Sequence, residues 1–368
     1  MTRLLRSLVA VFTLASPVAF AAPVEQAERP VLDVVFALDT TGSMGGLLEG
    51  AKQKIWSIAS RMAAGKPTPR VRVGLVAYRD VGDVYVSKVY ALSEDLDAVY
   101  KDLRSFQADG GGDTPEAVHR ALADAVDKMA WTQAQHAAKM IFLVGDAPTH
   151  PEDRPALLAA SKRAIQKGIV VNTVRCGGAT DTEGQFREVA RLADGRFDSI
   201  DQTGGVVAVA TPFDADLGRL NSELMDTAIY AGKREAQAAG ETRRAEAKAL
   251  AAPAAADRMA FHAKTAPAEG GSGASAVGAL DLADAPEKAA AMKAEELPAP
   301  MQKLSQPERV EFAKKQQARR QTLEKEIALV TKQRDDFIAT QVKEKKDSFD
   351  SRVFESVKTS ASKAGVKY

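Results

Sequence analysis

The sequence predicts an α/β protein: a doubly wound, mostly parallel six-stranded sheet flanked by helices, followed by a disordered linker and a helical C-terminal region. Two observations predict the sheet. Several apolar runs are too continuous for a sheet that is covered on one face, and helical patterns of crossover length separate them. A third observation separates the rest of the chain from the sheet domain. After residue 232, alanine, glycine and proline replace most large apolar side chains.

Three continuous apolar runs predict strands covered on both faces, and two alternating runs predict a second strand and an edge strand. The continuous runs are Val31–Leu38, Met140–Val144 and Ile169–Val174, the alternating runs are Arg70–Tyr78 and Val84–Leu92, and Arg196–Ile200 is a short last strand. Apolar spacing predicts the helices Gly46–Ala64, Leu96–Phe106, Glu116–Met129, Pro155–Lys167 and Glu183–Leu192, with Pro212–Ala231 as closing helix. This first domain is expected to span residues 29–232.

Residues 1–21 have the pattern of a secretory signal peptide. Arg3 and Arg6 precede an apolar stretch, Leu8–Phe20, that ends in a small-x-small cleavage site. The stretch is shorter than the ~20 residues of a membrane span. We therefore expect an exported protein without a transmembrane span after cleavage, located in the bacterial periplasm or, alternatively, secreted. Its single cysteine, Cys176, allows no internal disulfide.

Residues 233–306 and 307–368 are expected to differ from the first domain and from each other. The first segment is rich in Ala, Pro and Gly, so it is interpreted as a linker that is partly helical near Arg234–Leu250. The second is a charged helical pattern in which Leu323, Val330 and Phe337 are seven residues apart. With fewer than three clean heptads, a helix lying on the first domain or on a partner is favoured over a self-associating coiled coil.

Three loops bring oxygen-bearing side chains to the edge at which open parallel sheets bind ligands, beyond the carboxyl ends of the strands. They are DTTGS at residues 39–43, GGGDTPEAV at residues 110–118 and VGDAPTH at residues 144–150. None of them contains a His–Cys cluster of the kind that binds zinc. Carboxylates together with hydroxyls suit a hard divalent cation, and Mg²⁺ above all.

The DTTGS stretch resembles the D-x-[ST]-x-S motif of von Willebrand factor A (vWA) domains, the metal-ion-dependent adhesion site (MIDAS). The resemblance covers roughly residues 29–232, with all three loops in the family's order. It implies that Thr41 and Ser43 ligate the cation directly, while Asp39 and Asp146 hold its waters. The sequence as a whole most resembles bacterial exported proteins whose vWA domain has an integrin-like MIDAS.

The middle loop is more similar to the D-x-P-E segment of integrin β-type A domains, in which the glutamate binds the metal. This similarity implies Glu116 as the loop ligand, with Thr114 as the alternative. It also implies a second cation site at Asp80 and Asp113, for which a solvated turn residue and a helix N-cap are the plainer roles. The expected cation is Mg²⁺, with Mn²⁺ or Ca²⁺ as alternatives.

These observations predict a non-enzymatic module whose cation captures an Asp or Glu side chain of a partner protein. The net charge of +1 argues against a nucleic-acid partner. One alternative is an envelope assembly or scaffold factor that acts through its C-terminal helices, with helical self-association. Another is a phosphotransferase, because DTTGS also resembles the D-K-T-G-T of haloacid-dehalogenase-type enzymes. That family's distal motif, however, requires an aspartate where His150 stands.

Overall fold

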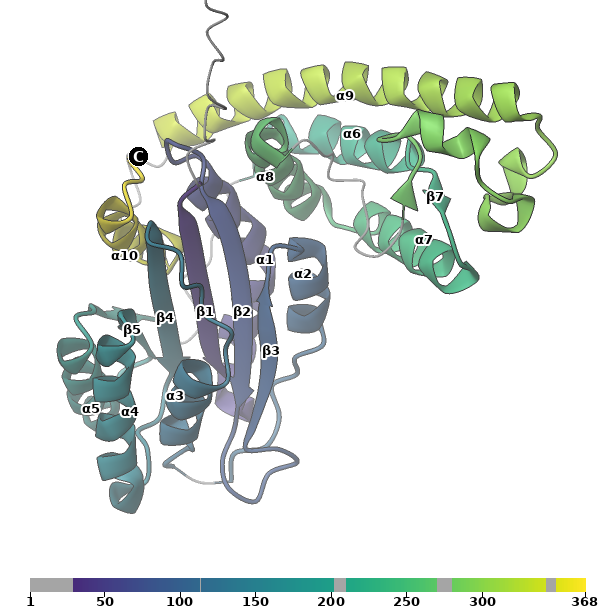
Figure 1. Cartoon of the computed structure of the whole chain (residues 1–368). Coiled ribbons are helices and arrows are strands. Elements are labelled where there is room, and N and C mark those ends of the chain that lie inside the picture. Colours follow the sequence, from purple (N-terminus) through teal and green to yellow (C-terminus); the bar gives the residue numbers. More distant parts are fainter. Residues whose placement is uncertain (1–28, 113, 202–209, 270–279, 342–348) are drawn as a thin grey trace, which may run out of the picture.

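The computed structural model describes residues 29–112, 114–201, 210–269, 280–341 and 349–368 (Figure 1). The expected signal peptide and Asp113 lie outside these residues. Among the helices that are described, none combines the length and the hydropathy that a membrane span requires.

Six strands form one sheet in the order β3-β2-β1-β4-β5-β6, with β3 antiparallel to β2 and the other neighbours parallel. Their bounds are β1 Val31–Asp39, β2 Arg70–Tyr78, β3 Ser87–Ser93, β4 Ala137–Gly145, β5 Ile169–Cys176 and β6 Phe197–Ile200. The predicted mostly parallel, doubly wound sheet is therefore confirmed. The expected start of the edge strand at Val84 is wrong, because that residue is 86% exposed in the loop before β3.

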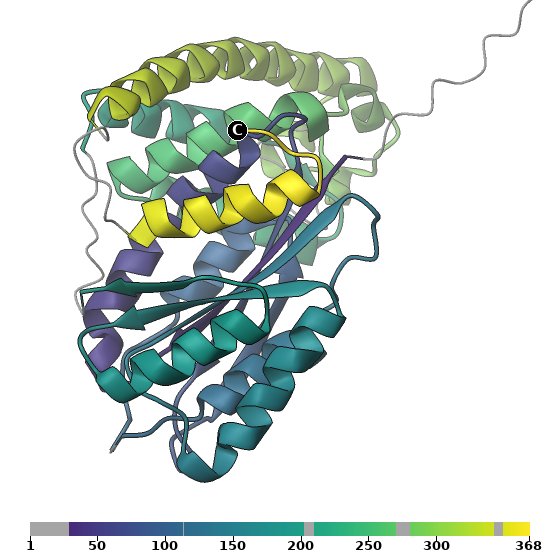
Figure 2. The same cartoon turned by 90° about the vertical axis from the view of Figure 1, so that its left-hand side faces the viewer.

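Helices cover both faces of the sheet, and the alternation of side chains along β1 explains why its sequence is continuously apolar. Val34 and Phe36 pack toward α1 (Gly45–Ala63) and α2 (Leu96–Arg104), whereas Val35 and Ala37 pack on the opposite face. That opposite face is covered by α3 (Val118–Asp127), α4 (Arg154–Gln166) and α5 (Thr180–Leu192), as Figures 1 and 2 show.

The last helix of the α1–α2 face comes from the far end of the chain. Helix α10 (Phe349–Lys363) lies against β4 and α1, with Val353 and Val357 buried in the same apolar cluster as Phe142 (Figure 2, yellow). Beyond it, the backbones of Lys66 and Lys367 exchange two hydrogen bonds of 2.8 and 2.9 Å. The C-terminal helix thus completes the covering of the sheet.

The prediction that a helix over Pro212–Ala231 closes the sheet domain is wrong. Helix α6 (Asp214–Asp226) instead buries Leu217 and Leu220 against helices from later in the chain, and a short strand, β7 (Tyr230–Ala231), follows it. The apolar pattern predicted a packed helix correctly, but periodicity alone does not identify the surface on which a helix packs.

A second layer of helices lies beside the sheet domain. It contains α6, α7 (Arg234–Lys248), α8 (Ala252–Glu269) and the long α9 (Gln306–Gln341). The short elements are η1 (Gly42–Met44), η2 (Pro151–Asp153), β8 (Leu280–Asp281), η3 (Pro286–Ala290), η4 (Ala294–Glu296) and η5 (Ala299–Met301). On α9, Leu323 and Ile327 are buried against α6 and α8, so this apolar stripe packs within the chain.

The described part of the expected linker is largely helical rather than disordered. Small side chains on α8, Ala254 to Ala256, are buried, and α8 packs closely against α1. Close packing of alanines buries backbone and side-chain surface that a search for large apolar residues does not detect.

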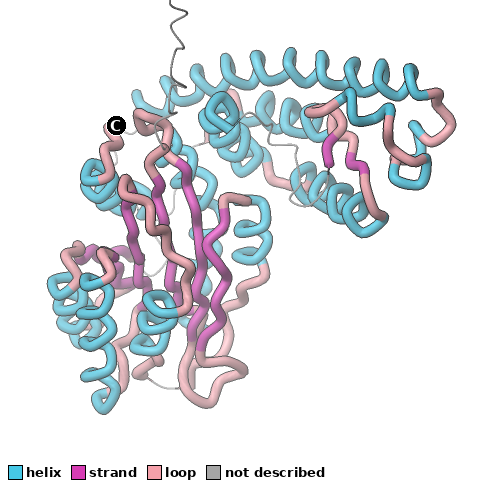
Figure 3. The backbone as a smooth tube through the Cα atoms, viewed as in Figure 1, coloured by secondary structure: helices cyan, strands magenta, loops and turns pink. Residues whose placement is uncertain are grey.

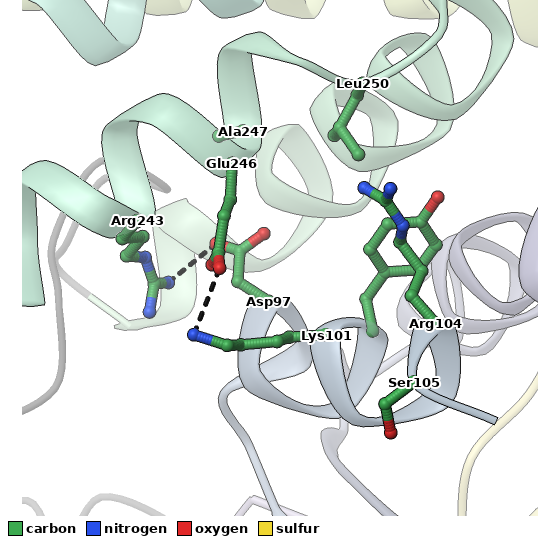
Figure 4. Close-up of a pocket in the computed structure, with 9 residues that line it drawn as sticks. Asp97, Lys101, Arg104, Ser105, Arg243, Glu246, Ala247 and Leu250 are labelled. Atoms are coloured by element: carbon green, nitrogen blue, oxygen red, sulfur yellow. Dashed lines mark ion pairs between the residues drawn. The ribbon is translucent and has the colours of Figure 1, made fainter.

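Arginines of the helical layer bind the first turn of α2. Arg258 donates to both carboxylate oxygens of Asp97, at 2.7 and 2.8 Å, and Arg243 donates to Asp95 at 2.6 Å. Figure 4 shows Arg243 directed at Asp97, beside a pocket of about 380 Å³ between α2 and α7. The exposed Lys101 pairs with Glu246 at the edge of this pocket. These contacts fix α2, whose other end leads into the glycine-rich loop.

Candidate metal site

The ends of β1 and β4 and the loop before α3 bring the predicted ligands together. Asp39 is the last residue of β1, and Thr41 and Ser43 follow it at the turn into η1. Asp146 comes directly after β4, and Glu116 lies just before α3. These loops lie at the lower end of the sheet in Figure 3, where the parallel strands finish, away from α9.

Backbone hydrogen bonds connect the three loops. The amide of Gly42 donates to the carbonyl of Gly110 at 3.1 Å, which joins the first loop to the second. The amide of Glu116 donates to the carbonyl of Pro148 at 2.9 Å, which joins the second to the third. These hydrogen bonds therefore fix the positions of the three loops that carry the side chains of the site.

Asp39 is fully buried and orients the two hydroxyls that follow it. Its Oδ1 accepts hydrogen bonds from the amide of Thr41 at 2.9 Å and from the Thr41 hydroxyl at 2.7 Å. The Thr41 and Ser43 hydroxyls are 3.3 Å apart. The other carboxylate oxygen of Asp39, Oδ2, is buried and has no hydrogen-bond partner among the described residues.

Gly145 allows Tyr78 and Asp39 to approach the backbone closely at the end of β4. A Cβ at this position would lie 2.3 Å from the hydroxyl of Tyr78 and 3.2 Å from Oδ2 of Asp39. The Tyr78 hydroxyl in turn donates to the carbonyl of Val144 at 3.1 Å. Any larger residue at 145 would displace the Tyr78 hydroxyl and crowd Asp39.

Glu116 faces the first loop across Gly111, whereas Thr114 is exposed. Gly111 has a φ of +72°, and a Cβ there would lie 2.9 Å from Cβ of Thr41 and 3.0 Å from Oε1 of Glu116. Oε2 of Glu116 is a second buried carboxylate oxygen that lacks a partner within the described part of the chain. Of the two candidate loop ligands, the structure thus brings Glu116 against Thr41.

Burial raises the pKa of both carboxyl groups. The pKa of Asp39 rises to about 7, mainly through desolvation, and the Asp146 charge raises it further against the hydrogen bonds from Thr41. Desolvation raises the pKa of Glu116 to about 8, and the charges of Asp39 and Asp80 add to it. Buried carboxylates that repel one another are stabilised by a cation placed between them.

The donor set therefore fits a hard divalent cation. It combines neutral hydroxyls with carboxylate oxygens that lack other partners, which is chemistry that Mg²⁺ accepts. Among the described residues, no group of three or more His, Cys, Asp or Glu side chains is arranged to hold a metal by itself. Bound metal here would depend on the hydroxyls of Thr41 and Ser43.

The expected second cation site is only partly described. Nε2 of His150 lies 2.7 Å from Oδ1 of Asp80, and this hydrogen bond and the aspartate's charge raise the pKa of His150. Asp113, the other expected ligand, lies outside the described residues. Asp80 is buried and has this imidazole as a partner, so the plainer role of a solvated turn residue is wrong.

Sequence reasoning missed Asp83. Its carboxylate accepts hydrogen bonds from the amides of Gly111, at 3.2 Å, and Asp80, at 3.1 Å, so it ties the β2–β3 loop to the glycine-rich loop. Its charge also contributes to the raised pKa of Glu116. The available signal was a glycine followed by an aspartate shortly after a strand, which is typical of a tight turn.

Comparison with known proteins agrees with this architecture. A doubly wound sheet with hydroxyls and carboxylates at its carboxyl edge defines a class of ligand-binding α/β domains. Residues 33–201 match the sequence profile of the von Willebrand factor type A domain. The chain therefore carries a vWA domain, the class of domain that generally mediates adhesion and protein interaction.

Individual relatives are distant. A putative ariadne-like RING finger protein of Acanthamoeba polyphaga mimivirus is 26% identical over 122 residues, which are 33% of this chain and 12% of the viral protein. Among solved structures, the SpRpn10 VWA domain is 15% identical with a TM-score of 0.37, covering 47% of this chain and 89% of that one.

Two further structures show the same general likeness. Proximal thread matrix protein 1 from the mussel byssus, with a zinc-occupied MIDAS motif, is 14% identical with a TM-score of 0.37, covering 46% of this chain and 42% of its own. The pilus adhesin SpaC of Lactobacillus rhamnosus GG is 16% identical with a TM-score of 0.38, covering 48% and 28%. The chain thus spans less than half of these two proteins.

Proposed function

We propose that the protein is an exported protein-binding module in which a MIDAS-bound divalent cation captures an Asp or Glu side chain of a partner protein. Mg²⁺ is the proposed resident ion, with Mn²⁺ or Ca²⁺ as alternatives. The observation that carries the proposal is the pair of buried carboxylate oxygens, Oδ2 of Asp39 and Oε2 of Glu116, that lack partners in the described structure beside two hydroxyls.

The charges of this donor set explain why an anion would be the preferred partner. Thr41 and Ser43 contribute neutral oxygens, so they do not neutralise a cation. A divalent ion bound directly by these hydroxyls and by one carboxylate, that of Glu116, with Asp39 and Asp146 holding its waters, would be only partly neutralised by its direct ligands. It would supply an open position for a partner's carboxylate. Asp39 accepts a hydrogen bond from the Thr41 hydroxyl and so orients it.

We infer binding rather than catalysis. In the phosphotransferase alternative an acid would stand at position 150, but this residue is a histidine that pairs with Asp80. The scaffold alternative, with helical self-association, also has less support. The apolar residues Leu323, Ile327 and Val357 that would form such a helical surface are buried within the chain itself.

Metal titration of the full chain by calorimetry tests the ligand assignment. We expect Mg²⁺ or Mn²⁺ to bind wild type, and Ser43→Ala, Thr41→Val and Glu116→Gln to lose at least tenfold in affinity, as is usual when a metal ligand is removed. Thr114→Ala and the remote control Asp226→Asn, which alters an exposed carboxylate paired with Lys248, should bind the ion like wild type.

Partner capture tests the second half of the proposal. Cross-linking in cell envelopes, followed by mass spectrometry, should give adducts that chelator removes and added Mg²⁺ restores. Adducts that persist in chelator and in Ser43→Ala would contradict a metal-dependent interaction. They would favour a partner surface on the C-terminal helices instead.

A further inference from the structure

The pocket between α2 and α7 lies where the helical layer meets the sheet domain (Figure 4). The described residues that line it are outside the three metal loops. Its volume of about 380 Å³ is within the range of small-molecule sites, about 300–1,000 Å³, which are frequent where two packed units meet. The chemistry of its walls therefore indicates what kind of molecule it can hold.

One wall of the pocket is apolar. It is formed by the ring of Tyr100 on α2 and by the aliphatic side chains of Ala247, on α7, and Leu250, in the turn after α7. The Tyr100 ring is packed against the buried Trp56, with the ring centres 6.1 Å apart. Burial raises the pKa of Tyr100, so its hydroxyl is neutral at ordinary pH. This wall fits the hydrocarbon part of a ligand.

The charged groups of the pocket leave one cation in excess. The carboxylate of Asp97 is bound by arginines of the helical layer, and Glu246 pairs with Lys101 at 3.0 Å. Arg104 forms no ion pair with any residue in the described ranges, and its guanidinium lies 6.0 Å from the centre of the Tyr100 ring. An exposed guanidinium beside an aromatic wall is a suitable partner for an anion.

Acids near the pocket do not cancel this excess charge. Glu49 acts on the Tyr100 ring from α1, but its carboxylate is paired with Lys52 at 2.8 Å. Asp102 stands two positions before Arg104, so the two side chains lie on different faces of α2. The guanidinium of Arg104 thus remains the charge that a ligand in the pocket would meet.

We propose that this pocket binds a small carboxylate with an aromatic or branched aliphatic body. The carboxylate accepts hydrogen bonds from the Arg104 guanidinium, and the body lies on Tyr100 and Leu250. In Figure 4 the side chains of Arg104 and Leu250 point toward one another, so one small molecule can contact both. A neutral apolar ligand would leave the guanidinium without an anion, and a bare anion would leave the apolar wall in water.

Calorimetric titration of the full chain tests the inference. The probe is 3-phenylpropanoate, compared with the neutral 3-phenylpropan-1-ol and with acetate, which lacks the apolar body. All titrations contain chelator, so that a divalent ion at the proposed metal site cannot capture the carboxylate. We expect 3-phenylpropanoate to bind wild type at least tenfold tighter than the alcohol, because of the charged hydrogen bonds, and tighter than acetate by a similar factor, because of the buried ring.

Three substitutions should change this affinity in different directions. Arg104→Gln should weaken binding about tenfold, and Leu250→Trp, which fills part of the pocket, should abolish it. Glu246→Gln releases Lys101 from its acid partner, so it should tighten binding about threefold. The matched control is Arg191→Gln, which alters an exposed arginine in the last turn of α5 and should bind like wild type.

The opposite results would overturn the inference. Equal affinity of wild type and Arg104→Gln, or of the acid and the alcohol, would show that no carboxylate is recognised. Acetate binding as tightly as 3-phenylpropanoate would remove the role of the apolar wall. Binding that Leu250→Trp retains would place the ligand elsewhere, and no binding by wild type would refute the site. These results leave the proposed function untouched, because no divalent ion takes part.

Discussion

Carboxylates largely shielded from water occur in two regions of the molecule, and their neighbours differ in charge. At the metal site, Asp39 and Glu116 are surrounded by other acids, and burial raises their pKa values to about 7 and 8. At the contact between α2 and the helical layer, Asp97 is surrounded by arginines. Although burial acts to raise its pKa, the charges and hydrogen bonds of Arg258, with the charge of Arg243, hold it well below its usual value.

The difference shows how the same side chain serves two purposes. Asp97 has its counter-charges built into the fold, so it contributes to the docking of α8 on α2 without any ligand. In the part of the chain that the structure describes, no basic side chain pairs with Asp39 or Glu116, so their burial is unfavourable until a metal binds. The first region is expected to be stable by itself, and the second is expected to gain stability from an added ion.

The largest expected effect follows from removing the built-in cation. Arg258→Met leaves Asp97 with Arg243 alone and also removes the hydrogen bond from Arg258 to Asn221, at 2.8 Å. Breaking one side of a buried ion pair costs about 3–5 kcal/mol. Because the Asp97 side chain is 14% exposed and keeps Arg243, we expect a loss near the lower end of this range in the free energy of unfolding, measured by urea denaturation.

A double-mutant cycle sharpens this prediction. Arg258→Met/Asp97→Leu should recover a large part of the loss, because it removes both the buried charge and its partner. Equal stability of the single and double variants would mean that Asp97 is not the group that Arg258 compensates.

The sheet and the three ligand loops were predictable from the sequence because their signals are local. Each strand is a short apolar run, and Asp39, Thr41 and Ser43 occupy adjacent positions at the end of one of them. The parallel topology then brings loops at strand ends to one edge of the sheet.

The docking of the C-terminal part was not predictable in the same way. Val353 and Val357 have helical spacing, which predicts that the helix packs but not that it packs on β4 more than 200 residues earlier. The pairing of Arg258 with Asp97 likewise spans 161 positions and has no local signature. At the site itself, the bond between His150 and Asp80 depends on loop geometry that residue spacing does not contain.

Asparagine substitutions should have opposite effects in the two regions. In chelator, Asp39→Asn should leave the unfolding free energy unchanged or raise it, because the amide oxygen can still accept from Thr41 while a charge without a cation is removed. Asp97→Asn should lower it by about 1–3 kcal/mol, since two arginines lose their carboxylate. Thermal and urea unfolding of both variants gives the comparison.

Added metal should then separate the variants further. At about 100 times its Kd, Mg²⁺ is expected to stabilise wild type and Asp97→Asn by about 2.7 kcal/mol, and Asp39→Asn by much less. Stabilisation of Asp39→Asn equal to that of wild type would contradict a metal site at the end of β1. Destabilisation of Asp39→Asn in chelator would contradict the contrast between the two regions.

The most gradual effect is a dependence of stability on pH at the contact between the sheet domain and the helical layer. His262 is packed among the rings of Trp56 and Phe261, and burial, with the charges of Arg258 and Arg243, lowers its pKa to about 3 against the opposing charge of Asp97. The unfolded chain therefore binds a proton from about pH 6.5 downward that the folded chain does not.

Stability should consequently fall as the pH decreases from about 6.5 toward 3, by at most about 1.4 kcal/mol per pH unit from this group. His262→Phe keeps a ring in the cluster and removes the titrating group, so its unfolding free energy should change less steeply over this interval. His136→Gln, at an exposed position, should keep the wild-type slope. If His262→Phe retained the wild-type slope, His262 would not be the source of the acid sensitivity. The source would then be the carboxylates bound by arginine, chiefly Asp97. The lowered pKa of Asp97 also makes stability fall with decreasing pH, but at lower pH.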